Sequence, residues 1–85
     1  MHDTHMVEKI YQALFDIYSK DWITKIYEIK ISISQDSHIN ETNLLEFLIE
    51  RNNLVFGEWT RINIDRKNMD KLSAVIMEIN GEKDE

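Results

Sequence analysis

The sequence predicts a small α+β domain, with two helices packed against a three-stranded mixed sheet in the order α-β-α-β-β. Two segments carry apolar residues at helical spacing, and three others alternate apolar and polar residues as half-buried strands do. The 85 residues, 42% of them hydrophobic, suffice for one domain with a single modest core. We therefore expect one domain over residues 1–85, with residues 81–85 forming a flexible acidic tail.

The first helix is predicted from an apolar pattern over residues 6–18, with Lys20 near its end, where a positive charge complements the helix dipole. Its apolar residues recur every three or four positions, at Met6, Ile10, Leu14 and Ile17. Thr4 is the expected N-cap, because a threonine hydroxyl accepts a hydrogen bond from the first turn of a helix. Residues 1–3 would then precede the helix, with amide groups that the helical hydrogen bonds do not use.

The first strand is predicted over residues 25–34. Its buried face is expected to carry Tyr27, Ile29, Ile31 and Ile33, which alternate with polar residues. A polar turn over residues 35–38 leads to a second helix capped near Asn40. The apolar residues of this helix are Leu44, Leu45, Phe47, Leu48 and Ile49, and its end is signalled by Asn52, Asn53 and Gly57.

Two more strands are predicted, over residues 59–65 and residues 72–79, separated by a loop over residues 66–70. A right-handed crossover through the second helix would make the first two strands parallel, either as direct neighbours or across another strand. The last two strands are expected to pair as an antiparallel hairpin. The acidic end after them is expected to be solvated, although it could also fold on a basic partner.

Composition excludes several classes of function. The net charge of −6, with lysines and arginines scattered among acidic residues, argues against binding nucleic acid. The chain has no cysteine, so it holds neither a disulfide nor a thiolate metal site. No secretory signal or bilayer-length apolar stretch is present, which predicts a cytoplasmic protein without a membrane partner. The sequence shows no nucleophile–base pair and no phosphate-binding loop, so it gives no indication of an enzyme.

The start of the chain carries the residues that point to metal chemistry. An α-amine, the neighbouring amide nitrogens and the imidazole of His2 lie within chelating reach of one another, and such a nitrogen-rich set suits Ni²⁺ or Cu²⁺. The alternative is that His2 is a solvated side chain at a frayed end. His5 could share a face with His2 if the helix began early, or could be a surface or capping residue. His38 is expected to be solvated in its turn, unless folding carries it toward the N-terminus.

Four segments follow, in order and spacing, the motifs of one protein family. That family begins Met-His-Glu, and this chain begins with Met1, His2 and Asp3. Its first strand reads Val-x-x-Val-x-Leu-x-Ile, its second helix carries Leu-x-Phe-x-Phe, and its next strand follows Glu-Gly-Ala; residues 26–33, 45–49 and 57–64 are similar. The chain thus resembles the nickel-binding domain of the HypA family, the nickel metallochaperones of hydrogenase and urease maturation.

The resemblance has two departures. The family inserts a zinc module with two Cys-x-x-Cys pairs before the last strand, and this cysteine-free chain holds no such structural zinc. Ser34, Gln35 and Asp36 stand where the family usually has Gly-Glu-Leu after the first strand. The chain therefore looks like a minimal, single-domain relative.

The resemblance implies an exchangeable Ni²⁺ cargo, with a maturation GTPase and a hydrogenase precursor as partners. The expected ligands are the α-amine of Met1, the backbone nitrogens of His2 and Asp3, and the His2 imidazole, with His5 as a further candidate. The alternative is a metal-free interaction or regulatory domain that keeps the same fold. The sequence does not indicate an oligomeric state.

Overall fold

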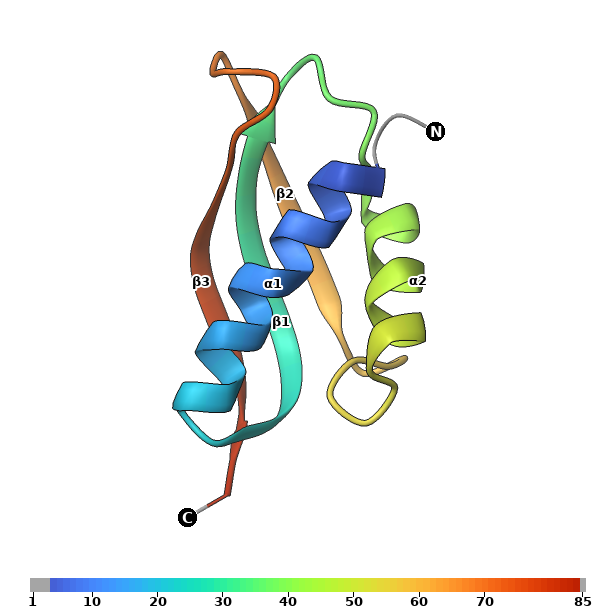
Figure 1. Ribbon diagram of the computed structural model, residues 1–85, viewed down its shortest axis with the longest axis vertical. Coiled ribbons are helices and arrows are strands. Elements are labelled where there is room, and N and C mark those ends of the chain that lie inside the picture. The colour runs from blue at the N-terminus through green and yellow to red at the C-terminus, as the bar shows by residue number, and fades with distance from the viewer. Residues whose placement is uncertain (1–3, 85) are drawn as a thin grey trace.

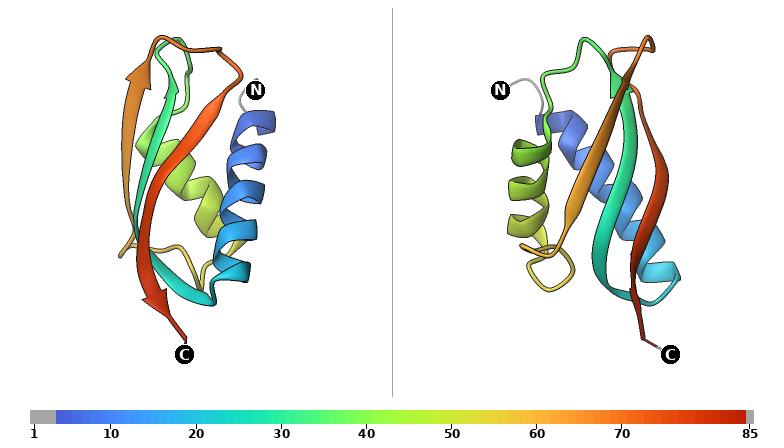
Figure 2. Two further views of the ribbon diagram at one scale, coloured as in Figure 1. Left: turned by 90° about the vertical axis from the view of Figure 1, so that its left-hand side faces the viewer. Right: turned by 180° about the vertical axis from the view of Figure 1, so that it is seen from behind.

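The computed structural model describes residues 4–84 as two helices packed on a three-stranded sheet (Figure 1). In chain order the elements are α1 (Thr4–Lys20), β1 (Ile23–Ser34), α2 (Glu41–Arg51), β2 (Arg61–Lys67) and β3 (Ala74–Lys83). Both helices lie on the same side of the sheet, and the other side carries no helix in this part of the chain (Figure 2). The predicted fold class and element order are confirmed.

The strand order is β2-β1-β3, so β1 is the central strand. β1 and β2 are parallel, as the crossover through α2 predicts, and of the two arrangements left open the structure shows direct pairing, with Ile29 opposite Ile62. The predicted hairpin of the last two strands is wrong, because β3 pairs antiparallel with the far edge of β1, where Ile79 lies opposite Ile29. Residues 68–73 carry the chain from one edge of β1 to the other, which brings Ile79 against the core.

The core lies between the sheet and the two helices. Its fully buried members include Leu14 of α1, Ile29 and Ile33 of β1, and Leu44 and Leu48 of α2. Each such side chain contributes roughly 1.5–3 kcal/mol relative to an exposed one. The spacing of apolar residues thus identified the faces of α1 and α2 that meet the sheet.

The ends of the helices differ in how well they were predicted. Asn40 is the N-cap of α2, and its side chain accepts a hydrogen bond of 2.8 Å from the backbone N–H of Asn43, as expected. Thr4 is the first residue of α1 and not its cap. α1 ends at Lys20, as expected, two residues after the last residue of the apolar pattern, because apolar periodicity marks only the turns of a helix that face the core.

A bulge in β1 overturns one predicted core residue. Ile26 is fully buried, whereas Tyr27 is 41% exposed, and the pairing of β1 with β3 shifts register between Ile26 and Glu28. The segment before β2 fixes the bulge from the other side: the Ile26 N–H donates to the carbonyl of Val55 at 3.0 Å, and the Thr60 hydroxyl donates to the carbonyl of Ile26 at 2.7 Å. Residues 59 and 60 therefore belong to this connection, and β2 begins at residue 61.

The C-terminal residues join the sheet further than predicted. β3 continues to Lys83, with Gly81 opposite Ile26 and Glu82 opposite Lys25, so residues 81–83 are strand and not a solvated tail. Glycine is required at position 81 by a close approach of backbone, because a Cβ there would lie 2.2 Å from the carbonyl oxygen of Lys25. The bulged part of β1 and the end of β3 thus hold each other in place.

Candidate metal centre

The candidate site lies at the end of the sheet where β1 and β2 finish and both helices begin (Figure 1). The loop from β1 to α2 and the loop from β2 to β3 meet the first turns of α1 there. They enclose a cavity of about 610 Å³. The cavity is lined by His5, Met6, Lys9, Ser37, His38, Asp70, Lys71 and Leu72.

Two of the three histidines of the chain share this cavity although they come from different elements. His5 lies in the first turn of α1, and His38 lies in the loop before α2; both side chains are exposed to solvent. Imidazole nitrogens suit Ni²⁺, Cu²⁺ and Zn²⁺. Asp70 lines the same cavity, and its carboxylate accepts a hydrogen bond of 2.9 Å from the N–H of Leu72. Within residues 4–84, no three His, Cys, Asp or Glu side chains are grouped closely enough to hold a metal ion by themselves. The residues that the structure describes therefore do not form a metal site by themselves.

Hydrogen bonds on both sides of His38 define the shape of its loop. The Ser37 hydroxyl accepts from the N–H of Ile39 at 3.2 Å, and the Ser37 N–H donates to the Ser34 carbonyl at 3.1 Å. From β2, the two terminal nitrogens of Arg66 donate to the carbonyls of Ser37, at 3.0 Å, and of Ile39, at 2.5 Å. The residues before and after His38 are thus both tied to the edge of the sheet.

The predicted ligands divide into two groups. Met1, His2 and Asp3 lie outside the described residues, so their part in a site stays a prediction. His5 lies in α1 and lines the cavity. His38 is exposed to solvent, as expected, and it also lines the same cavity, which is the alternative that the sequence left open.

Sequence reasoning missed Asp70 on the cavity wall and Arg66 behind the loop. The signal that could have found this region is its position, because loops at the carboxyl ends of parallel strands commonly form binding sites.

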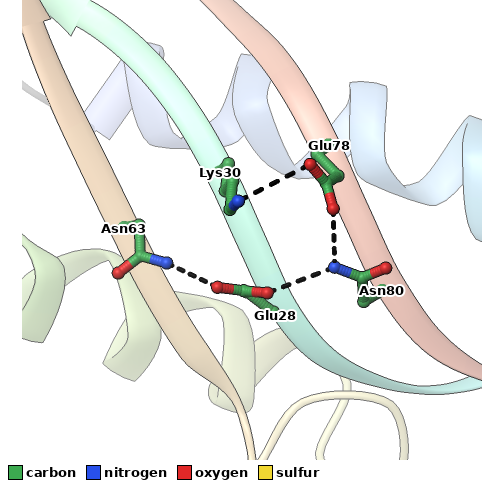
Figure 3. A network of polar contacts seen from close by, with 5 residues as sticks. All are labelled: Glu28, Lys30, Asn63, Glu78 and Asn80. Atoms are coloured by element: carbon green, nitrogen blue, oxygen red, sulfur yellow. Dashed lines mark hydrogen bonds and ion pairs between the residues drawn. The ribbon is translucent and has the colours of Figure 1, made fainter.

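The uncovered face of the sheet carries a separate polar network (Figure 3). The Asn80 amide donates to Glu28 at 3.1 Å and to Glu78 at 2.9 Å, and Asn63 donates to the other oxygen of Glu28 at 2.7 Å. Lys30 lies 3.6 Å from Glu78. The hydrogen bond from Asn80 and the charge of Lys30 lower the pKa of Glu78 below its ordinary value. The network links the three strands across the sheet.

A second polar cluster joins the two helices. The hydroxyls of Tyr11 and Tyr18 lie 3.1 Å apart, and the Asn52 amide donates to the Tyr18 oxygen at 3.2 Å. Burial and the hydrogen bond with Tyr11 raise the pKa of Tyr18 to about 12. The ring of Tyr18 meets Phe56 edge to face with ring centroids 5.9 Å apart, which ties α1 to the segment after α2.

Comparison with known proteins gives no family for this chain. No protein-family model matches it, and no curated protein matches it significantly. The resemblance to the HypA family therefore stays a prediction that depends on the motifs themselves. Of the helices in residues 4–84, none combines the length and apolar character that crossing a membrane requires.

Proposed function

We propose that this domain is a non-enzymatic, cytoplasmic Ni²⁺ carrier that binds the ion at the start of α1 and passes it to a metalloenzyme under maturation. The observation that carries the proposal is the cavity that His5 and His38 share. Residues 1–3 directly precede α1 in the sequence, and the proposal takes the His2 imidazole and backbone nitrogen as ligands from the chelating pattern of the first residues. Nitrogen-rich sets of this kind favour Ni²⁺ over hard ions such as Mg²⁺.

The position of these donors suits a carrier. His5 and His38 are exposed, and the core begins beneath them with Met6, Ile10 and Ile39. Binding and release of the ion then involve the rim of the domain and leave its buried residues in place. The resemblance to HypA proteins supports a maturation GTPase and a hydrogenase precursor as the partners of delivery.

Isothermal titration with Ni²⁺ tests the proposal on the wild type and on His2→Ala, His5→Ala and His38→Ala. The expected result is one ion per chain, abolished in His2→Ala and weakened at least about tenfold in a variant that loses a further ligand. Gln12→Ala is the control, because Gln12 is an exposed residue on the same helix outside the cavity lining. A wild type that binds no Ni²⁺, or a His2→Ala variant with unchanged affinity, would refute this site.

The second candidate function is a metal-free interaction domain, and one surface favours it. Leu72, Val75 and Met77, at and just before β3, are 70%, 48% and 59% exposed. Exposed apolar side chains gathered on one segment are a common property of protein-binding surfaces. A titration without Ni²⁺ binding, combined with an intact fold by circular dichroism, would favour this function over the carrier.

A further inference from the structure

Arg66 connects the sheet to the loop that carries His38. It lies near the end of β2, where it is paired with Ile33 of β1, and its guanidinium reaches across to the loop. Its two terminal nitrogens donate to different carbonyls, those of Ser37 and Ile39, which are the residues immediately before and after His38.

This contact needs the fork of an arginine. A guanidinium presents several N–H donors in one rigid plane, so one side chain can hold two carbonyls at a fixed separation. A lysine carries the same charge at a single nitrogen and cannot reproduce that spacing. Arg66 therefore fixes the backbone on both sides of His38 as one unit.

The contacts of the loop around His38 indicate what the Arg66 hydrogen bonds add. The bond from the Ile39 N–H to the Ser37 hydroxyl is local to the turn. The Gln35 N–H also ties the start of the loop to the Lys67 carbonyl at 2.8 Å, and Ile39 is buried in the core. The Arg66 contacts differ from these in that one side chain of β2 holds the carbonyls on both sides of His38. His38 itself is exposed, so packing does not hold its imidazole in place. The direction in which His38 faces the cavity then depends largely on its backbone.

We propose that Arg66 is a positioning residue, which holds His38 in the orientation that lets its imidazole bind the metal together with the donors at the start of α1. The inference rests on the proposed Ni²⁺ function and adds to it a residue outside the cavity lining. Residues that orient metal ligands through hydrogen bonds typically change metal affinity about 10–100-fold when they are replaced.

The test is Ni²⁺ titration of the full chain in the wild type, Arg66→Gln, Arg66→Lys and His38→Ala. Arg66→Gln is expected to weaken binding about tenfold, and Arg66→Lys is expected to behave like Arg66→Gln because it keeps the charge but loses the fork. Arg61→Gln is the matched control, since Arg61 begins β2 at the end away from the loop. Circular dichroism at the titration temperature verifies that each variant is folded.

A double-mutant cycle separates positioning from a general structural role. If Arg66 acts through His38, adding Arg66→Gln to His38→Ala should cause almost no further loss of affinity, whereas independent effects would add. Backbone order parameters from NMR should fall at residues 37–39 in Arg66→Gln without metal, while those of α2 stay unchanged.

The possible results distinguish the positioning role of Arg66 from the proposed carrier function. Wild-type affinity in Arg66→Gln, full affinity in Arg66→Lys, or additive losses in the double variant would overturn the positioning role and leave the carrier function standing. A wild type that binds no Ni²⁺ would overturn the proposed function and this inference together. An unaffected His38→Ala would show that the site uses other ligands and that Arg66 positions none of them.

Discussion

Replacing Gly81 with alanine tests whether the C-terminal residues are structural. Gly81 lies opposite Ile26 in the pairing of β3 with β1, next to the bulge that buries Ile26. A Cβ at this position would lie 2.2 Å from the Lys25 carbonyl oxygen, and also 3.2 Å from a methyl of Ile23 and from the Cα of Ile26. Real Cβ atoms essentially never approach other atoms within 3.0 Å. The carbonyl belongs to the backbone, so the strands themselves must move apart.

The size of the effect follows from this overlap. Adding atoms where the surrounding structure is closely packed costs about 1–3 kcal/mol. An alanine also restricts the unfolded chain more than glycine does, which offsets about 0.4–1 kcal/mol. Because the overlap is with backbone, the cost lies in the upper part of this range, and we expect a net loss of about 1–2.6 kcal/mol in the free energy of unfolding, which lowers the Tm of a domain of this size by roughly 4–20 °C.

Thermal and urea denaturation followed by circular dichroism measure this loss. Glu82→Ala is the control, because Glu82 neighbours Gly81 on the same strand and is exposed; its effect should stay within about 0.5 kcal/mol. Equal stability of Gly81→Ala and the wild type would refute the reasoning, since a solvated tail would accept alanine at no cost.

Three further outcomes are expected. Leu48→Ala, at a fully buried position, should lower the free energy of unfolding by about 2–5 kcal/mol in urea, whereas a chelator should leave the wild-type midpoint unchanged. Burial raises the pKa of Tyr18 from 10.0 to about 12, so the stability that it contributes below pH 10 should be lost as the pH rises toward 12; Tyr18→Phe should flatten this part of the stability profile. The pKa of Glu78 is lowered, so its contribution should be lost as the pH falls through that lowered pKa, and Asn80→Ala should raise the pKa in an NMR titration.

The fold was predictable where the pattern along one segment decides the structure. The buried isoleucines from Ile29 to Ile33 and the Asn40 cap depend on neighbouring residues, and both were predicted correctly. Ser32, which alternation places on the polar face, is nevertheless buried. The buried Ile26 depends on Val55 and Thr60, which lie far along the chain, so alternation alone placed Tyr27 inside instead.

The pairing of β3 was also decided by contacts between distant segments. Residues 68–73 form a connection longer than the usual two to five residues of a hairpin loop, and this length was the available sign that β2 and β3 are not neighbours. Strand propensity does not distinguish the two edges of β1. Pairing with the far edge brings Ile76 and Ile79 against the core, which the sequence pattern alone does not specify.

The candidate site was also difficult to predict, because it brings together residues that lie far apart in the sequence. His38 and Arg66 are separated by α2 and most of β2, and each alone resembles an ordinary exposed residue. Arg66 reaches the carbonyls on either side of His38 because β1 and β2 are parallel neighbours, which puts the loop after β1 beside the end of β2. Parallel pairing was predicted here, so the carboxyl ends of these strands could have been singled out from sequence as the place to seek partners for the N-terminal histidines. Which side chains meet there depends on strand register, and register follows from packing Ile29 and Ile31 of β1 beside Ile62 and Ile64 of β2.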